Sequence, residues 1–217
     1  MASTMLHYTI SNLILKEIQV DDRERFLLGA SLGPDASSHE DGSYVTAHYI
    51  KRTPDDTLKG VVWTDFSKKY EKIILDDDFV LGYYCHLIMD AVWLYDMADR
   101  YVRCYPLVER DKAYKRGYRD YDKLNYLLEN EYNLEKPSFN KLSNPISEIS
   151  EERLLKVLDF FTKCFNQSPS KKEDLDIYKW DKVKDYILRS TSLCVSEVKA
   201  LRNKTGGINP KDLFVKV

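Results

Sequence analysis

The segment FVLGYYCHLIMDAVWLY, residues 79–95, decides the fold of this chain because it is almost wholly apolar and aromatic. Such a run predicts a helix that is buried inside the molecule. Two polar residues in it, His86 and Asp90, are four residues apart, so a helix places both on one face. An unpaired carboxylate in these surroundings costs several kcal/mol. A divalent metal, a basic partner or the neighbouring imidazole must offset that cost.

Helical patterns also dominate the rest of the 217 residues, and no segment shows a convincing strand-like alternation of apolar and polar residues. The sequence therefore predicts an all-α protein. The expected helices are Met5–Ile18, Arg23–Ser31, a helix from Pro54 to about Ile74, the central helix after Asp76–Asp78, Pro106–Tyr132, a helix that begins after Ser150, and a last one from Ile177 to about Leu201.

The length of the chain fits one domain, so we expect a single helical domain over residues 1–217. Within it, residues 1–132 are expected to form a metal-binding helical core. The stretch from 133 to 150 is polar and lacks a clear period, which predicts a long connection. Residues 150–217 then form a C-terminal helical pair, either as part of the core or as a subdomain.

The composition argues against several functional classes. The 33 basic and 35 acidic residues give a net charge of -2 without a large block of one sign, so neither duplex DNA nor an anionic membrane is indicated. Stacking of nucleic-acid bases on some of the 16 tyrosines stays open. No segment predicts a transmembrane helix or a secretory signal, and the four cysteines are widely spaced. We therefore expect a cytoplasmic protein with free thiols; its oligomeric state is not indicated.

Five imidazole and carboxylate groups are candidates for a metal site. His7 lies on the expected first helix, Asp35 follows the Gly-Pro that ends the second, and His48 follows a serine-rich loop. With His86 and Asp90 they form a set of nitrogen and oxygen donors that suits a borderline cation such as zinc. A single buried histidine is more often a satisfied core residue than a ligand, so the prediction rests on the whole set.

Three segments carry a resemblance to a known family: FLLGASLGPDAS at 26–37, TAHY at 46–49 and GYYCHLIMDAVW at 82–93. Their order and spacing resemble the zinc-dependent phospholipase C family, which shares its helical fold with single-strand-specific nucleases. The family pattern is roughly F-x-x-G-x-x-x-P-D, then T-H-F, then G-x-x-x-H-L-x-x-D, with a further histidine on the first helix. The similarity covers about residues 5–95.

In this resemblance Asp35 matches the Pro-Asp aspartate, His48 the Thr-His-Phe histidine, His86 and Asp90 the His-x-x-x-Asp pair, and His7 the first-helix histidine. It implies a multi-helix bundle of the phospholipase C type with additional C-terminal helices. The chain has no histidine after His86, so a full three-metal cluster is not expected. One or two zinc ions that share Asp90 fit the residues better. The acids Asp96, Asp120 and Asp122 are candidates for further oxygen ligands.

The resemblance implies metal-dependent hydrolysis of a phosphoester, carried by a small molecule or a lipid head group. Asp35 would then act as general base as well as ligand. The expected substrate pocket is walled by Tyr84, Trp93 or Tyr49. Two alternatives stay open: a metal-binding helical protein without turnover, such as a sensor or interaction module, and a helical interaction module in which His86 and Asp90 merely satisfy each other.

Overall fold

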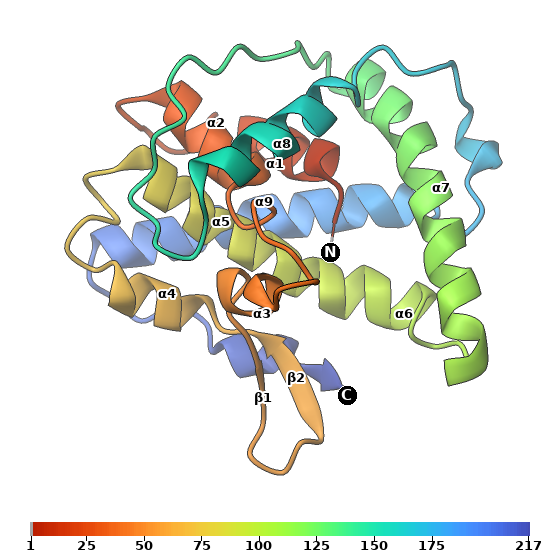
Figure 1. Cartoon of the computed structure of the whole chain (residues 1–217), viewed down its shortest axis with the longest axis horizontal. Helices are drawn as coiled ribbons and strands as arrows, with labels where there is room; N and C mark the ends of the chain where they lie inside the picture. Colours follow the sequence, from red (N-terminus) through yellow and green to blue (C-terminus); the bar gives the residue numbers. More distant parts are fainter. Residues whose placement is uncertain (1) are drawn as a thin grey trace.

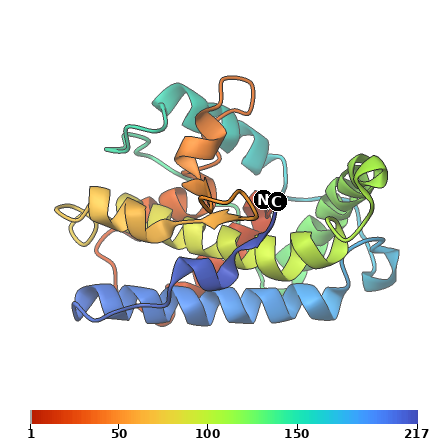
Figure 2. The ribbon, with the colours of Figure 1, turned by 90° about the horizontal axis from the view of Figure 1, so that it is seen from below.

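A computed structural model describes residues 2–217 and shows a mostly helical molecule with one small sheet. Helix α5 runs through the middle, with α9 along one face of the molecule and α8 on the opposite side (Figures 1 and 2). The helices are α1 Thr4–Ile14, α2 Arg23–Leu32, α3 Ser43–Ala47, α4 Trp63–Lys69, α5 Asp78–Trp93, α6 Asp99–Tyr101, α7 Leu107–Glu131, α8 Glu151–Thr162 and α9 Trp180–Arg202. A π-helical turn, Leu94–Ala98, follows α5, and 3₁₀ turns lie at Lys172–Asp174 and Pro210–Leu213.

The central helix forms as the sequence predicted. The Asp77 carboxylate caps α5 by accepting a hydrogen bond from the Phe79 N–H, and every residue from 79 to 93 is buried. Helices α2 and α5 pack with their backbones in contact, since a Cβ at Gly82 would lie 2.3 Å from the Phe26 carbonyl oxygen. This close packing brings the backbone of α2 against the helix face that carries His86.

The small sheet corrects the expectation of a helix from Pro54 to Ile74. Its antiparallel strands are β1 Ile50–Arg52, β2 Leu58–Val61 and β3 Val215–Lys216, in the order β1-β2-β3. Pro54 lies in the turn between β1 and β2, where the Asp55 carboxylate accepts hydrogen bonds from the Thr53 and Thr57 hydroxyls. Proline and aspartate favour such turns, and strands this short show no readable alternation.

The C-terminal half contains the predicted helices and the predicted connection. Helix α7 begins after Pro106, and the Ser150 hydroxyl caps α8 by accepting a hydrogen bond from the Arg153 N–H. Between α7 and α8, residues 133–149 form neither helix nor strand. Among residues 2–217, no helix has both the length and the apolar character that are needed to cross a membrane.

Glu148 fastens the end of this connection to the rest of the molecule. Its carboxylate accepts hydrogen bonds from the Tyr70 hydroxyl at 2.5 Å, from the Lys69 ammonium at 2.6 Å and from the Tyr49 hydroxyl. Burial raises the pKa of this carboxyl group, but hydrogen bonds from Lys69, Tyr49, Tyr70 and Ser147 outweigh it and lower the pKa to about 2.

We expect this contact to make the stability depend on pH. Because the folded-state pKa is lowered from 4.5 to about 2, the stabilisation is present above 4.5 and is lost as the pH falls toward 2. This lowering of the Glu148 pKa adds at most about 3 kcal/mol to the free energy of unfolding. Urea unfolding of wild type and Glu148→Gln should therefore show a stability difference at about pH 6 that shrinks toward about pH 2.5. An equal difference at both pH values would contradict the assignment.

Candidate metal centre

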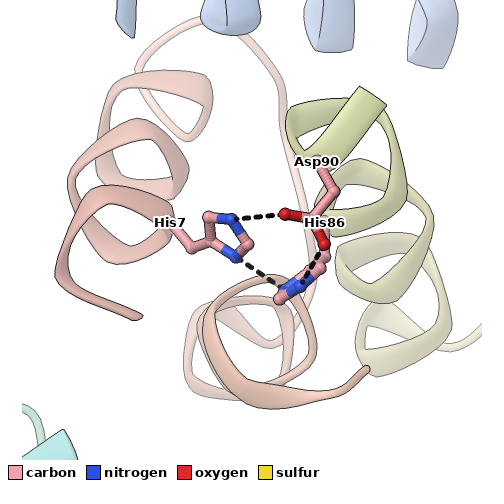
Figure 3. Close-up of side chains that lie close together, drawn as sticks. All are labelled: His7, His86 and Asp90. Atoms are coloured by element: carbon pink, nitrogen blue, oxygen red, sulfur yellow. Dashed lines mark hydrogen bonds and ion pairs between the residues drawn. The ribbon is translucent and has the colours of Figure 1, made fainter. Parts of the chain in front are cut away.

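The structure brings all five predicted site residues into one cluster. His7 comes from α1, His86 and Asp90 come from α5, His48 follows α3, and Asp35 follows α2. His7, His48, His86 and Asp90 are fully buried, whereas the Asp35 side chain is 20% exposed. Figure 3 shows His7 reaching from its helix toward His86 and Asp90 on the neighbouring one. Residues far apart in the sequence thus meet on the face of α5 that carries His86 and Asp90.

The carboxylate of Asp90 lies in the middle of the cluster. Its Oδ1 is 3.3 Å from His7 Nε2, and its Oδ2 is 3.2 Å from His86 Nε2 and 3.5 Å from His48 Nε2. Asp35 faces two of the same imidazoles, with Oδ1 at 3.4 Å from His48 Nε2 and 3.9 Å from His86 Nε2. Three ring nitrogens therefore face the oxygens of two carboxylates.

Backbone carbonyl groups fix the tautomers of two imidazoles. His48 Nδ1 lies 3.0 Å from the Tyr44 carbonyl oxygen, and His86 Nδ1 lies 3.0 Å from the Ala30 carbonyl oxygen. Because a carbonyl oxygen only accepts, each Nδ1 must carry a proton and donate it. In the neutral ring this leaves the Nε2 lone pair directed into the cluster. The same arrangement orients histidine ligands in metal sites.

The atoms that face one another in the cluster do not satisfy one another. Among the described residues, Nε2 of His7, His48 and His86 and Oδ2 of Asp90 are buried and have no hydrogen-bond partner. Buried polar atoms of native proteins are normally hydrogen-bonded, and a lone pair that faces a carboxylate oxygen is repelled by it. Either protons on the imidazoles or a cation must therefore compensate. The close approach of Asp90 to His86 is an ion pair only in the first case.

A hydrogen bond joins the rings of His7 and His86. Their Nδ1 atoms are 2.9 Å apart, and His86 Nδ1 carries the proton because it also faces the Ala30 carbonyl oxygen. His7 Nδ1 must then accept, so in the neutral ring the proton of His7 lies on Nε2, the atom that faces Asp90 Oδ1 at 3.3 Å. Unlike Nε2 of His48 and His86, this atom has no lone pair to offer a cation until that proton is lost.

The carboxyl groups keep their charge in this interior. Burial raises the pKa of Asp90, but the electrostatic interactions with His86 and His7 outweigh it and hold the pKa well below its usual value. For Asp35, burial likewise raises the pKa, but the hydrogen bond and charge of His48 and the charge of His86 outweigh it and lower the pKa. Positive charge on the imidazoles, or a divalent cation in its place, therefore keeps both carboxyl groups ionised.

The donor set could hold a metal ion. Two groups have ligand atoms that all lie within 4.8 Å of one another, one of His7, His86 and Asp90 and the other of Asp35, His48 and His86. Nitrogen and carboxylate oxygen are ordinary zinc ligands, and four of them complete a tetrahedral site. No family model, curated protein or solved structure matches the chain. The resemblance to the phospholipase C family therefore stays a prediction, and the functional proposal rests on the geometry.

The three acids considered as additional ligands lie outside these groups. Asp96 pairs with Arg189 at 2.6 Å, and Asp120 accepts hydrogen bonds from the backbone N–H groups of residues 176–178. Asp122 lines a cavity beside the cluster but is in neither ligand group. The first two acids thus have structural partners that the sequence did not reveal.

The expected pocket walls were wrong. The Tyr84 hydroxyl donates to Glu197, Trp93 packs against Tyr178 and Tyr186, and the Tyr49 hydroxyl donates to Glu148. The cavity that Asp35 reaches, of about 440 Å³, is walled instead by aromatic residues of α3, the loop before it, α7 and α8. These walls were missed because nothing in the sequence pairs α7 and α8 with the N-terminal half.

Proposed function

We propose that this protein is a zinc-dependent phosphoester hydrolase with a helical fold of the phospholipase C type and additional C-terminal helices. The observation that carries the proposal is that the buried Nε2 atoms of His48 and His86 have no hydrogen-bond partner and direct their lone pairs at two carboxylates. The cavity beside Asp35 gives a small phosphoester or a lipid head group access to this cluster. The fold class itself is supported by the helices that surround α5.

His48, His86, Asp35 and Asp90 would hold one ion, because Nε2 of both imidazoles lies 3.2–3.9 Å from an oxygen of each carboxylate. A second ion at His7 and Asp90 would require His7 Nε2 to lose the proton that the hydrogen bond with His86 places there. When bound, zinc lowers the pKa of a coordinated water and offsets negative charge on the phosphoryl oxygens. The carbonyl groups behind His48 and His86 keep both rings in the ligating tautomer. Their contribution is to fix the ligand geometry before any substrate arrives.

Asp35 is the group that connects the cluster to the cavity. It lines the cavity, is partly exposed and has a lowered pKa, whereas Asp90 is fully buried. An ionised carboxylate in this position accepts a proton from an attacking water and thereby acts as general base. Asp90, by contrast, serves only to hold the ion and to orient the imidazoles.

We propose a cytoplasmic location for the same protein. Cys85, Cys164 and Cys194 are buried free thiols, and Cys104 is an exposed one. Reduced cysteines of this kind are typical of a reducing compartment.

The proposed function predicts coupled losses of zinc and activity. His86→Ala should lower both the zinc content and the hydrolysis of bis(p-nitrophenyl) phosphate, the latter by at least about 100-fold. Asp35→Asn should lower the rate by a similar factor while more zinc is retained, because Asp90 and the imidazoles still bind. Elemental analysis of the purified protein and release of nitrophenolate measure the two quantities. Asp96→Asn is the matched control, since Asp96 follows α5 but pairs with Arg189.

The outcomes separate the alternatives. Zinc bound stoichiometrically without hydrolysis of any phosphoester would favour a metal-binding protein without turnover. A protein that binds no zinc even at excess would favour an interaction module in which protonated imidazoles pair with the carboxylates. Equal zinc content in wild type and His86→Ala would contradict the cluster as the binding site.

A further inference from the structure

The cavity of about 440 Å³ beside the cluster has features that the proposed function does not explain. It is bounded by the N-terminal residues, by α3 and the loop before it, and by helices α7 and α8. The Tyr44 ring lines it and lies 4.1 Å from the His48 ring, so the cavity adjoins the candidate metal centre. Its volume falls in the range of sites for small ligands. A phosphoryl group at the centre would leave room for the group that it carries.

Aromatic residues form much of the wall. Tyr118 and Tyr121 line the cavity from α7, with their rings in edge-to-face contact at 5.7 Å, and Phe160 lines it from α8. Tyr118 and Phe160 are 62% and 61% exposed, although they are large apolar side chains. Exposed aromatic residues around a concave site are typical of surfaces that contact the flat face of a ligand.

The cavity lining contains hydroxyl groups, which can donate or accept, and two side chains on α7, Asn125 and Asp122, that offer acceptor oxygens. Asn125 is only 4% exposed, and its Oδ1 has no hydrogen-bond partner among the described residues. Asp122 adds a carboxylate to the same lining, whereas the Lys156 ammonium is already 2.6 Å from the Glu152 carboxylate. A ligand that satisfies these groups must bring O–H or N–H donors. An unpaired buried amide oxygen otherwise costs about 1–3 kcal/mol.

We propose that this cavity holds a ring-shaped polyol, either a sugar or a cyclitol, which is attached to the phosphoryl group, and that Asn125 determines this specificity. The inference rests on the proposed function because it places the phosphoryl group at the metal centre. The C–H face of such a ring packs on Tyr118, and its hydroxyl groups donate to Asp122 and, after a rotation of the Asn125 amide that turns its buried Oδ1 toward the cavity, to Asn125. A quaternary ammonium head group has no donor and would leave Asn125 unpaired.

Equilibrium binding tests the inference without requiring turnover. Isothermal titration of the zinc-loaded full chain compares glucose 1-phosphate and myo-inositol 1-phosphate with methyl phosphate and phosphocholine. At least one of the two ring phosphates should bind 10-fold or more tightly than methyl phosphate, or about 1.4 kcal/mol. Which one binds more tightly distinguishes a sugar from a cyclitol. Binding of both within about threefold of methyl phosphate, or tighter binding of phosphocholine, would overturn the inference.

Variants locate the preference in the cavity. Asn125→Leu should remove the preference for the ring phosphate, because the site no longer has the acceptor that distinguishes a ligand with a hydroxyl group from one without it. The affinity for methyl phosphate should stay unchanged. Asn130→Leu, at an exposed position of the same helix, is the matched control. Tyr118→Ala changes an exposed residue, so it tests the wall even if Asn125→Leu fails to fold, and should weaken ring phosphate binding severalfold.

The result is independent of catalysis. A ring preference that depends on Asn125 in a protein that hydrolyses no phosphoester would sustain the inference and reject the hydrolase. Hydrolysis of bis(p-nitrophenyl) phosphate without any ring preference would sustain the hydrolase and reject the inference.

Discussion

Saturating zinc is expected to raise the thermal midpoint of unfolding by about 5–10 °C, and Asp90→Asn to abolish that rise. A ligand present at about 100 times its Kd, which binds only the native state, adds about 2.7 kcal/mol of stability. In a domain of this size each kcal/mol shifts the midpoint by about 2–4 °C. The expected rise follows from these two magnitudes. Asp90 is the residue to change because its two oxygens face all three imidazoles.

The zinc-free protein gives the sharper result. If the imidazoles are neutral, the amide that Asp90→Asn introduces brings an N–H donor to lone pairs that previously faced a carboxylate. The variant should then be at least as stable as wild type without zinc. If the imidazoles are instead protonated and ion-paired with Asp90, removing the buried charge should destabilise the protein by about 3–5 kcal/mol. Whether zinc-free Asp90→Asn is more or less stable than zinc-free wild type thus distinguishes a metal site from a buried ion pair.

Thermal scans with zinc and with a chelator, at about pH 8, measure both effects. Asp96→Asn serves again as control and should retain the full response to zinc. A midpoint of wild type that does not respond to zinc would contradict the metal site, whatever the behaviour of the variant.

The central helix and its His86–Asp90 pair were predictable because they depend on a local pattern. The apolar run at 79–95 indicates a buried helix, and the spacing of His86 and Asp90 within it places both on one face. The order of Asp35 and His48 in the sequence suggested two further contributors. What the sequence did not show was the role of the Ala30 and Tyr44 carbonyl groups, because any residue offers a carbonyl and only the packing of the helices positions it.

The cavity was not predictable for a related reason. Its walls come from α7 and α8, so Tyr118 and Phe160 approach Asp35 only after the long connection has placed α8. The hairpin was missed because β1 and β2 are too short to show a period. Both the cavity walls and the hairpin depend on contacts between segments that are distant in the sequence, and a single sequence does not show such contacts directly.

Glu197 is a buried carboxylate outside the proposed site, and its loss should be among the most destabilising changes in this protein. It is only 3% exposed and accepts hydrogen bonds from Trp63 Nε1 at 3.2 Å, the Tyr84 hydroxyl at 3.1 Å and the Ile208 N–H at 2.8 Å. These donors come from α4, α5 and the segment after α9, so one side chain joins three parts of the fold.

We expect Glu197→Leu to lower the free energy of unfolding by about 3–6 kcal/mol. The substitution leaves three donors without an acceptor, and each unsatisfied buried group costs about 1–3 kcal/mol. Native domains are stable by about 5–15 kcal/mol in total, so the variant should be only marginally folded. Urea unfolding at neutral pH measures the difference, and Glu197→Gln, which keeps one acceptor oxygen, should show a smaller loss.

A double-mutant cycle with Tyr84→Phe tests the cause of the loss. Alone, Tyr84→Phe removes one hydrogen bond to Glu197 and should destabilise the protein by about 1 kcal/mol. In the Glu197→Leu background the same change removes a hydroxyl that has lost its acceptor, so it should restore stability instead. Equal destabilisation in both backgrounds would mean that Glu197 acts through packing. A change of sign would show that the unpaired donors, and not the missing side-chain volume, account for the loss.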